Sequence, residues 1–135
     1  MGRVGRRCRL GVDRQRWARL IRRGEIRLVD LDPVRGAESN KRRPVVIVSN
    51  DGANGAAQRL GHGVITVVPV TSNVERVYPF QVLLTASETG LQRDSKAQAE
   101  QVRSVAVERI GARLATLTPE QQSDLDEALR LHLAL

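Results

Sequence analysis

Short aliphatic segments bounded by turn-forming residues constrain the fold of this chain more than any other feature of the sequence. Four such segments are rich in Val, Ile and Leu: 26–31, 44–48, 64–70 and 80–84. Stretches of this length and composition predict β-strands, and one or two more are predicted within 97–106. The nearly continuous apolar run at 44–48 is typical of a strand that is buried on both faces.

The segments between these strands carry turn and loop signals. Asp32 and Pro33 end the first strand, and residues 34–42 form a polar loop with Gly36 as its hinge. Residues 49–52 are a dense turn signal. The stretch 53–60 predicts a short helix, which Gly55 weakens.

A helix is predicted at the C-terminus. Thr118, Pro119 and Gln121 have the spacing of a capping box with proline at the first helical position. The residues that follow at helical spacing are Leu125, Ala128, Leu129 and His132, with Leu133 beside them. Short strands and one amphipathic C-terminal helix predict a mainly β domain of the α+β class, built on a small barrel-like sheet.

The composition indicates one globular domain. The chain has 135 residues, of which 41% are hydrophobic and only 2% aromatic. It contains no apolar run of the roughly 20 residues that a membrane span needs, so we expect no membrane association. The single cysteine, Cys8, has no partner for an internal disulfide, which favours a cytoplasmic location.

The net charge of +7 is concentrated at the N-terminus. Residues 1–23 hold nine of the 22 cations and one acid, whereas the remainder has 13 cations against 14 acids. We therefore divide the chain into a basic, flexible extension, 1–22, and a folded domain, 23–135. An RNA-binding arm and an artefact of the annotated start site are the alternative interpretations of the extension.

The candidate site is predicted from two strands that are neighbours along the chain. If the strands 44–48 and 64–70 pair in antiparallel fashion, the start of the first lies beside the end of the second. Arg43 and Thr71 then meet at one rim of the sheet, next to the loop that carries Glu38. An ordinary surface cation, a turn hydroxyl and a solvated loop acid are the alternatives for these three residues.

These groups suit a reaction in which RNA cleaves its own backbone. A guanidinium binds phosphate bidentately and stays charged at any accessible pH. A hydroxyl can donate to a phosphate oxygen, and Glu38 could take a proton. Attack by the ribose 2′-hydroxyl on the adjacent phosphodiester needs no external nucleophile, so electrostatic stabilisation can suffice.

Other chemistries have weaker support in the sequence. His62 and His132 are far apart in the chain, and with one cysteine no zinc-type spacing exists. The chain has neither a P-loop nor a Gly-x-Ser-x-Gly motif. We therefore expect no cofactor and no metal, although Asp30 and Asp32 leave a carboxylate-held Mg²⁺ as an alternative.

Seven landmarks in the same order and at similar spacing resemble the MazF/PemK toxins. They are residues 23–26, 30–33, 36–38, 43–46, 68–72, 78–80 and 100–104, within a match that spans about 22–133. The resemblance implies an SH3-like small barrel of the CcdB/MazF type. It also implies a type II toxin–antitoxin toxin that cleaves single-stranded RNA at specific short sequences, without a metal, and so inhibits translation and growth.

The same resemblance assigns roles to individual residues. Arg43 and Thr71 fall on the family's catalytic arginine and threonine, Glu38 on its loop glutamate and Gln101 on its RNA-contacting glutamine. We predict that Ser72, Lys41 and Arg42, which flank these positions, also bind RNA. The implied assembly is a homodimer, with loop 34–42 as a mobile lid. A MazE-like antitoxin would neutralise it by placing an acidic tail in the RNA groove.

Two departures and two rival functions qualify the resemblance. Ala37 stands where many relatives have Ser, and Arg27 where many have an aromatic residue, so base preference is not transferred from any relative. A CcdB-like toxin that acts on DNA gyrase is the first rival, but the Trp-Gly-Ile end that this activity needs is absent. An inactive module that binds RNA or antitoxin is the second.

Overall fold

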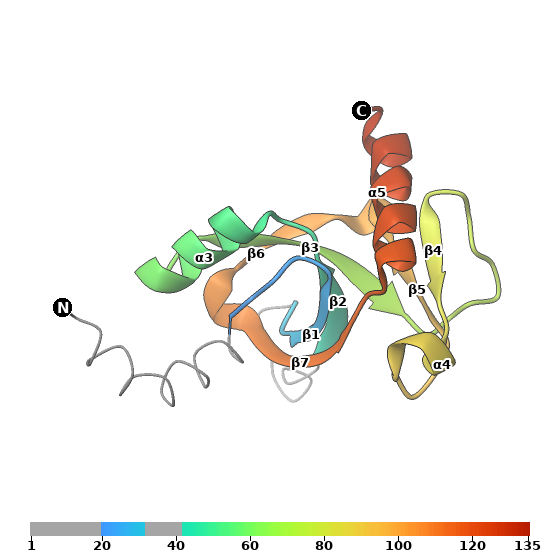
Figure 1. Cartoon of the computed structure of the whole chain (residues 1–135), viewed down its shortest axis with the longest axis horizontal. Helices are drawn as coiled ribbons and strands as arrows, with labels where there is room; N and C mark the ends of the chain where they lie inside the picture. The colour runs from blue at the N-terminus through green and yellow to red at the C-terminus, as the bar shows by residue number, and fades with distance from the viewer. Residues whose placement is uncertain (1–19, 32–41) are drawn as a thin grey trace.

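Seven strands form an antiparallel sheet in the part of the chain that the computed structural model describes, residues 20–31 and 42–135. The strand order is β4-β5-β3-β2-β1-β7, and β6 pairs with β3. The strands are β1 (Glu25–Val29), β2 (Arg43–Ile47), β3 (Val64–Thr71), β4 (Gln81–Leu84), β5 (Ser95–Gln98), β6 (Arg103–Ala106) and β7 (Ile110–Thr116). The sheet curls around its centre, and the helices lie at its periphery (Figure 1).

Strand β2 is continuous and apolar because it contributes to two cores. Val45, Val46 and Ile47 are all fully buried. Since side chains alternate along a strand, Val46 packs in one cluster with Ile26 of β1, while Val45 and Ile47 pack in a second. The prediction of a strand buried on both faces is confirmed.

Helix α3 (Asp51–Leu60) begins within the predicted turn signal. Asn50 is its N-cap, and the Asn50 side chain accepts a hydrogen bond from the Ala53 amide. Gly61, with φ of 73°, ends the helix in the left-handed conformation. The helix therefore starts two residues before the predicted stretch, because an N-cap uses the same residue types as a turn. Ala57 packs it against the second core.

Helix α5 (Pro119–Leu133) has the predicted capping box, with both reciprocal hydrogen bonds between Thr118 and Gln121. Leu125 and Ala128 pack against the first core, next to Leu84 of β4. Figure 1 shows α5 standing against β4, on the other side of the molecule from α3. His132, one of the residues at helical spacing, is exposed, so the buried face ends one turn earlier than predicted.

Strand β7 is absent from the elements that the sequence predicts. Its residues are either half-buried or exposed, and Gly111 interrupts the apolar pattern near the start of the strand. It nevertheless pairs with β1, with a register shift on each side of Arg27. Pairing with a strand that lies over 80 residues earlier in the chain is a tertiary effect that local propensity does not encode.

Short helical segments complete the described chain. α4 (Ala86–Thr89) replaces the turn predicted around residue 89, and Gly90 ends it with φ of 82°. The 3₁₀ turn η2 (Ala99–Gln101) separates β5 from β6, which resolves the predicted one or two strands into two. A second 3₁₀ turn, η3 (Val107–Arg109), leads into β7.

Candidate active site

Arg43 is the first residue of β2 and lies opposite Val29 of β1. Its side chain is exposed, and no ion pair or hydrogen bond joins its guanidinium to the residues within 20–31 and 42–135. Three other arginines are used differently: the side chains of Arg27, Arg103 and Arg109 all donate to backbone carbonyls. Among the described residues, the donors of Arg43 are thus left unused, unlike those of Arg27, Arg103 and Arg109.

Thr71 is the last residue of β3 and is partly buried. Its Oγ1 accepts a hydrogen bond from the Asn73 amide at 3.2 Å. Because this bond uses a lone pair of the hydroxyl oxygen, the hydroxyl proton stays available for donation. The short turn after β3 thus orients Thr71 as a donor to a ligand at the end of the sheet.

The sheet brings Arg43 and Thr71 to the same edge. Strands β2 and β3 are antiparallel, with Val45 opposite Pro69 and Ile47 opposite Val67. The pairs end at Val45 and Pro69, and counting two further residues in the same register would set Arg43 level with Thr71. Directly opposed residues of an antiparallel pair point to the same face, with Cα atoms about 4.5–5.5 Å apart. The strand pairing on which the predicted site depends is therefore present.

The remaining predicted site residues are distributed as follows. Arg42 precedes β2 and is exposed, and Ser72 follows Thr71 and is exposed. Gln101 is also exposed, in η2, which lies along β3 on the side away from β2. Glu38 and Lys41 lie outside the described residues.

A network of buried charged side chains, which the sequence pattern did not indicate, is centred on Glu25 and Arg27 of β1. The Arg27 side chain is 6% exposed and its Nε donates to Glu25 Oε1 at 2.8 Å. Its other nitrogens donate to the carbonyls of Gly111 and Leu20. Arg113 of β7 approaches the second carboxylate oxygen of Glu25 at 3.6 Å. Each of the three nitrogens of this buried guanidinium therefore has a hydrogen-bond acceptor.

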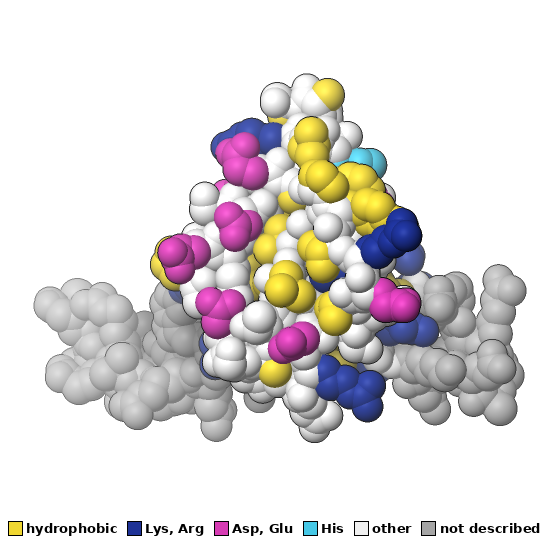
Figure 2. Space-filling view, turned by 90° about the vertical axis from the view of Figure 1, so that its right-hand side faces the viewer, with side chains coloured by type: hydrophobic (Ala, Val, Ile, Leu, Met, Phe, Trp, Pro, Cys, Tyr) yellow, Lys and Arg dark blue, Asp and Glu magenta, His cyan; other side chains and the backbone are white. Residues whose placement is uncertain are grey.

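The face formed by α5 and β4 has a different character. Figure 2 shows hydrophobic side chains through the middle of this face, with carboxylates mainly along one side. A cavity there, of about 550 Å³, is lined by Leu83, Leu131, Asp124 and Glu127 among others. Its carboxylates would repel phosphate groups, so the edge that carries Arg42 and Arg43 is better suited to an anionic ligand.

Two features of residues 20–31 and 42–135 bear on other classes of function. None of the helices there combines the length and apolar character needed to cross a bilayer. That part of the chain also has no group of three or more His, Cys, Asp or Glu side chains arranged to hold a metal ion.

Comparison with known families decides what kind of protein this is. The family model of PemK-like, MazF-like toxins of type II toxin–antitoxin systems matches residues 22–133. The chain belongs to this family. The seven landmarks thus predicted the family correctly.

Two relatives of this MazF-family chain are named as endoribonucleases. MazF9 of Mycobacterium tuberculosis is 62% identical over 116 residues, which cover 86% of this chain and 98% of that protein. EndoA of Bacillus subtilis is 32% identical over 117 residues, covering 86% of this chain and 97% of that protein. The predicted class, a toxin endoribonuclease, is confirmed at the level of the family.

Solved structures confirm the fold. A mycobacterial endoribonuclease in complex with its cognate antitoxin matches with a TM-score of 0.65 at 23% identity, over 85% of this chain and 96% of that one. MazF of Deinococcus radiodurans matches with a TM-score of 0.64 at 24% identity, over 86% of this chain and 98% of that one. The predicted mainly β architecture with peripheral helices is thus the MazF fold. The catalytic and RNA-binding roles of individual residues stay predictions.

Proposed function

We propose that this MazF-family endoribonuclease cleaves single-stranded RNA at specific short sequences, by attack of a ribose 2′-hydroxyl on the adjacent phosphodiester. One observation supports the proposal: β2 and β3 are antiparallel neighbours, so Arg43 at the start of β2 and Thr71 at the end of β3 lie at the same edge of the sheet. In our proposal, a guanidinium with no partner among the described residues and a hydroxyl that can donate hold one phosphate group at this edge.

The reaction needs little beyond electrostatic stabilisation. The 2′-oxygen forms a bond to phosphorus while the bond from phosphorus to the 5′-oxygen breaks. The products are a 2′,3′-cyclic phosphate and a 5′-hydroxyl. The guanidinium of Arg43 offsets the charge that develops on the non-bridging oxygens, and Thr71 donates to one of them. Glu38 takes the proton of the 2′-hydroxyl, and a proton from water or a protein acid neutralises the leaving 5′-oxygen.

Arg43 and Thr71 supply the stabilisation for which other nucleases use a divalent cation, so we propose cleavage without a metal. Ser72, Arg42, Lys41 and Gln101 contact the RNA on either side of the cleaved bond. Their exposure, where the structure describes them, is consistent with this role.

The biological setting follows from the relatives. The mycobacterial endoribonuclease was solved with its cognate antitoxin, and the Deinococcus radiodurans protein was solved as MazE–MazF. The present chain would act in the cytoplasm as a homodimeric toxin that inhibits translation and growth. A MazE-like antitoxin would neutralise it, with an acidic tail that occupies the phosphate-binding edge around Arg43.

Replacement of Arg43 tests the proposal. Purified Arg43→Ala should lose RNA cleavage by about 10²–10³-fold, because one electrostatic contact to the transition state is removed. Its fold should be retained, because the side chain is exposed and packs against nothing in the described cores. The measurement is cleavage of a long single-stranded RNA in EDTA, with the new ends mapped and tested for cyclic phosphate.

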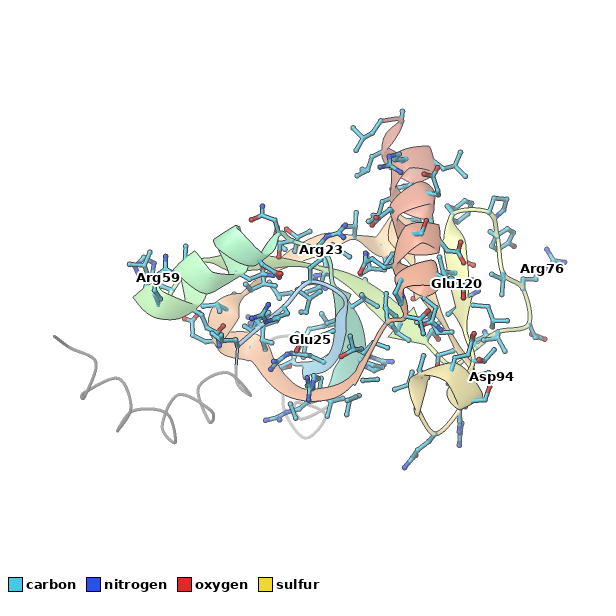
Figure 3. The ribbon with its side chains drawn as sticks, viewed as in Figure 1. Arg23, Glu25, Arg59, Arg76, Asp94 and Glu120 are labelled. Atoms are coloured by element: carbon cyan, nitrogen blue, oxygen red, sulfur yellow. The ribbon has the colours of Figure 1, made fainter. Side chains whose placement is uncertain are left out.

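Arg59→Ala is the matched control, since Arg59 is also an exposed arginine but lies on α3, away from the sheet edge (Figure 3). It should cut RNA at the wild-type rate. Wild-type cleavage by Arg43→Ala would refute the site, and loss of cleavage in EDTA would refute the metal-free reaction. Growth inhibition that persists without any RNA cleavage would instead favour a protein-binding toxin of the CcdB kind.

A further inference from the structure

A polar cavity adjoins the proposed cleavage site on the side of β3 away from β2. It has a volume of about 470 Å³ and is lined by Asn73, Glu75, Arg76, Tyr78 and Lys96. Lys96 of β5 lies directly opposite Thr71 in the sheet register, so both side chains point to the same face. The cavity therefore starts one strand beyond the predicted catalytic hydroxyl.

Lys96 is a buried cation that pairs with no carboxylate of the described residues. The residue is only 7% exposed, and no carboxylate within 20–31 and 42–135 forms an ion pair with its ammonium group. The ammonium donates to the Arg76 carbonyl at 2.5 Å and lies 5.9 Å from the centre of the Tyr78 ring. An ammonium has three donors, and no described residue besides Arg76 accepts a hydrogen bond from this one. Buried lysines that form no ion pair are uncommon and often belong to binding sites.

The loop between β3 and β4 supplies the other walls. Tyr78 stacks on Phe80 with ring centres 5.4 Å apart and planes 3° apart, which holds the Tyr78 ring in a fixed orientation. Figure 3 shows Arg76 on the outside of this loop, with its side chain pointing away from the body. The Arg76 backbone carbonyl accepts the hydrogen bond from Lys96, and this bond joins the loop between β3 and β4 to strand β5. Glu75 adds an exposed carboxylate to the cavity wall.

We propose that this cavity binds one base of the RNA, next to the cleaved phosphodiester, and that Lys96 and Glu75 select it. The inference rests on the proposed function and names a specificity subsite for it. Bases of single-stranded RNA are recognised by stacking on aromatic rings and by hydrogen bonds to their edges. The Tyr78 ring, stacked on Phe80, forms an aromatic wall of the cavity, Lys96 donates to a carbonyl oxygen, and Glu75 accepts from an amine.

This pair of contacts predicts which bases bind. Guanine and cytosine carry both a carbonyl oxygen and an exocyclic amine, whereas adenine lacks the carbonyl and uracil lacks the amine. The cavity should therefore prefer guanine or cytosine at one position beside the cut.

Cleavage of an RNA library with a randomised stretch tests this preference. The wild-type protein should favour G or C at one position by about tenfold, the discrimination typical of a good base contact. Lys96→Met should lose that preference while preferences at other positions persist. Glu75→Gln, a surface change that leaves the fold intact, should also lower it. Arg93→Met is the matched control, because Arg93 is an exposed cation just before β5 and outside the cavity. An unchanged preference in Lys96→Met, or an equal loss for all four bases, would overturn the inference.

A second measurement does not depend on cleavage. Tyr78 is the only tyrosine in the chain, so selective tyrosine labelling gives a single ring spectrum by NMR. Cytidine or guanosine monophosphate should shift these signals more than adenosine or uridine monophosphate, and Lys96→Met should abolish the difference. If the protein cuts no RNA, the proposed function fails, but this titration still decides the role of the cavity. No shift with any of the four nucleotides would refute it.

Discussion

The arginines of this chain have sharply different surroundings at the scale of single residues. Arg27 is buried and donates to Glu25 and two carbonyls, so it is part of the folded framework. Arg43 is exposed and has no such partner among the described residues. Identical side chains thus serve structure in one case and, in our proposal, chemistry in the other. The difference lies in what surrounds each guanidinium.

Gly24 is a residue whose conformation a side chain would strain. Its φ is +92°, and an added Cβ would lie 2.7 Å from Gln122 Oε1. Its amide donates to Ile47 and its carbonyl accepts from Leu117, so the backbone there cannot easily relax. We expect Gly24→Ala to lower the free energy of unfolding by about 1–3 kcal/mol, measured by urea denaturation.

Gly55→Ala is the control for this prediction. Gly55 lies inside α3 and is not among the positive-φ glycines. Alanine is the better helix former by about 1 kcal/mol, so the same substitution should leave the protein as stable or more stable. Equal destabilisation by both substitutions would contradict the argument from backbone conformation.

At the scale of elements, α5 is attached to the body by a polar contact as well as by its apolar face. Arg23 donates to Asp126 of α5 at 2.8 Å and to the Val48 carbonyl at 3.0 Å. Burial raises the pKa of Asp126, but hydrogen bonds from Arg23 and Gln122 and the charges of Arg23 and Arg130 outweigh it. The net effect lowers the pKa of Asp126 below its ordinary value.

This shift predicts how stability depends on pH. A carboxylate with a lowered pKa in the folded state stabilises the protein above its unfolded pKa, and that contribution disappears as the pH falls through the folded value. Asp126→Asn should therefore be less stable than the wild type at neutral pH, by no more than about 1 kcal/mol because the pair is one-third exposed. The difference should vanish in acid below the folded pKa, as followed by urea denaturation at several pH values.

Glu127→Gln on the same helix is the control. Glu127 pairs with Arg130, but both side chains are largely exposed, so little change in stability is expected at any pH. A difference between the wild type and Asp126→Asn that is the same at neutral and at acid pH would show that the charge of Asp126 is not the cause.

On the scale of the whole molecule, residues 20–22 join the folded domain more closely than the predicted boundary suggests. Ile21 is 5% exposed and packs in the second core, and its amide donates to Gln58 Oε1 at 2.8 Å. The Leu20 carbonyl accepts from Arg27 at 2.8 Å. These contacts mean that a truncation should be placed before Leu20.

Two truncations test this inference. The fragment 20–135 should keep the thermal stability of the full chain and most of its RNA cleavage, since the proposed site lies in the folded domain. The fragment 23–135 loses the buried Ile21 and one carbonyl partner of Arg27, and should be less stable by about 2–4 kcal/mol. Thermal unfolding and RNA cleavage of both fragments are the measurements. A large loss of cleavage in 20–135 would show that residues 1–19 take part in the activity.

The sequence by itself determined the elements whose causes are local. The capping box at Thr118 specified the start of α5 because its hydrogen bonds join residues three apart. The apolar run of β2 indicated a doubly buried strand, and the order of β2 and β3 was enough to predict that Arg43 and Thr71 share an edge. The landmarks between residues 23 and 104 identified the family.

Only the tertiary structure decided the features that depend on distant partners. β7 is held by its pairing with β1 and has little pattern of its own. The buried Arg27 side chain depends on the carbonyls of Leu20 and Gly111, which are 91 residues apart in the chain. The cavity at Lys96 depends on the loop that contains Arg76, which lies 20 residues earlier in the chain. A charged side chain is recognised as framework or as binding site by what surrounds it, and long-range packing supplies those surroundings.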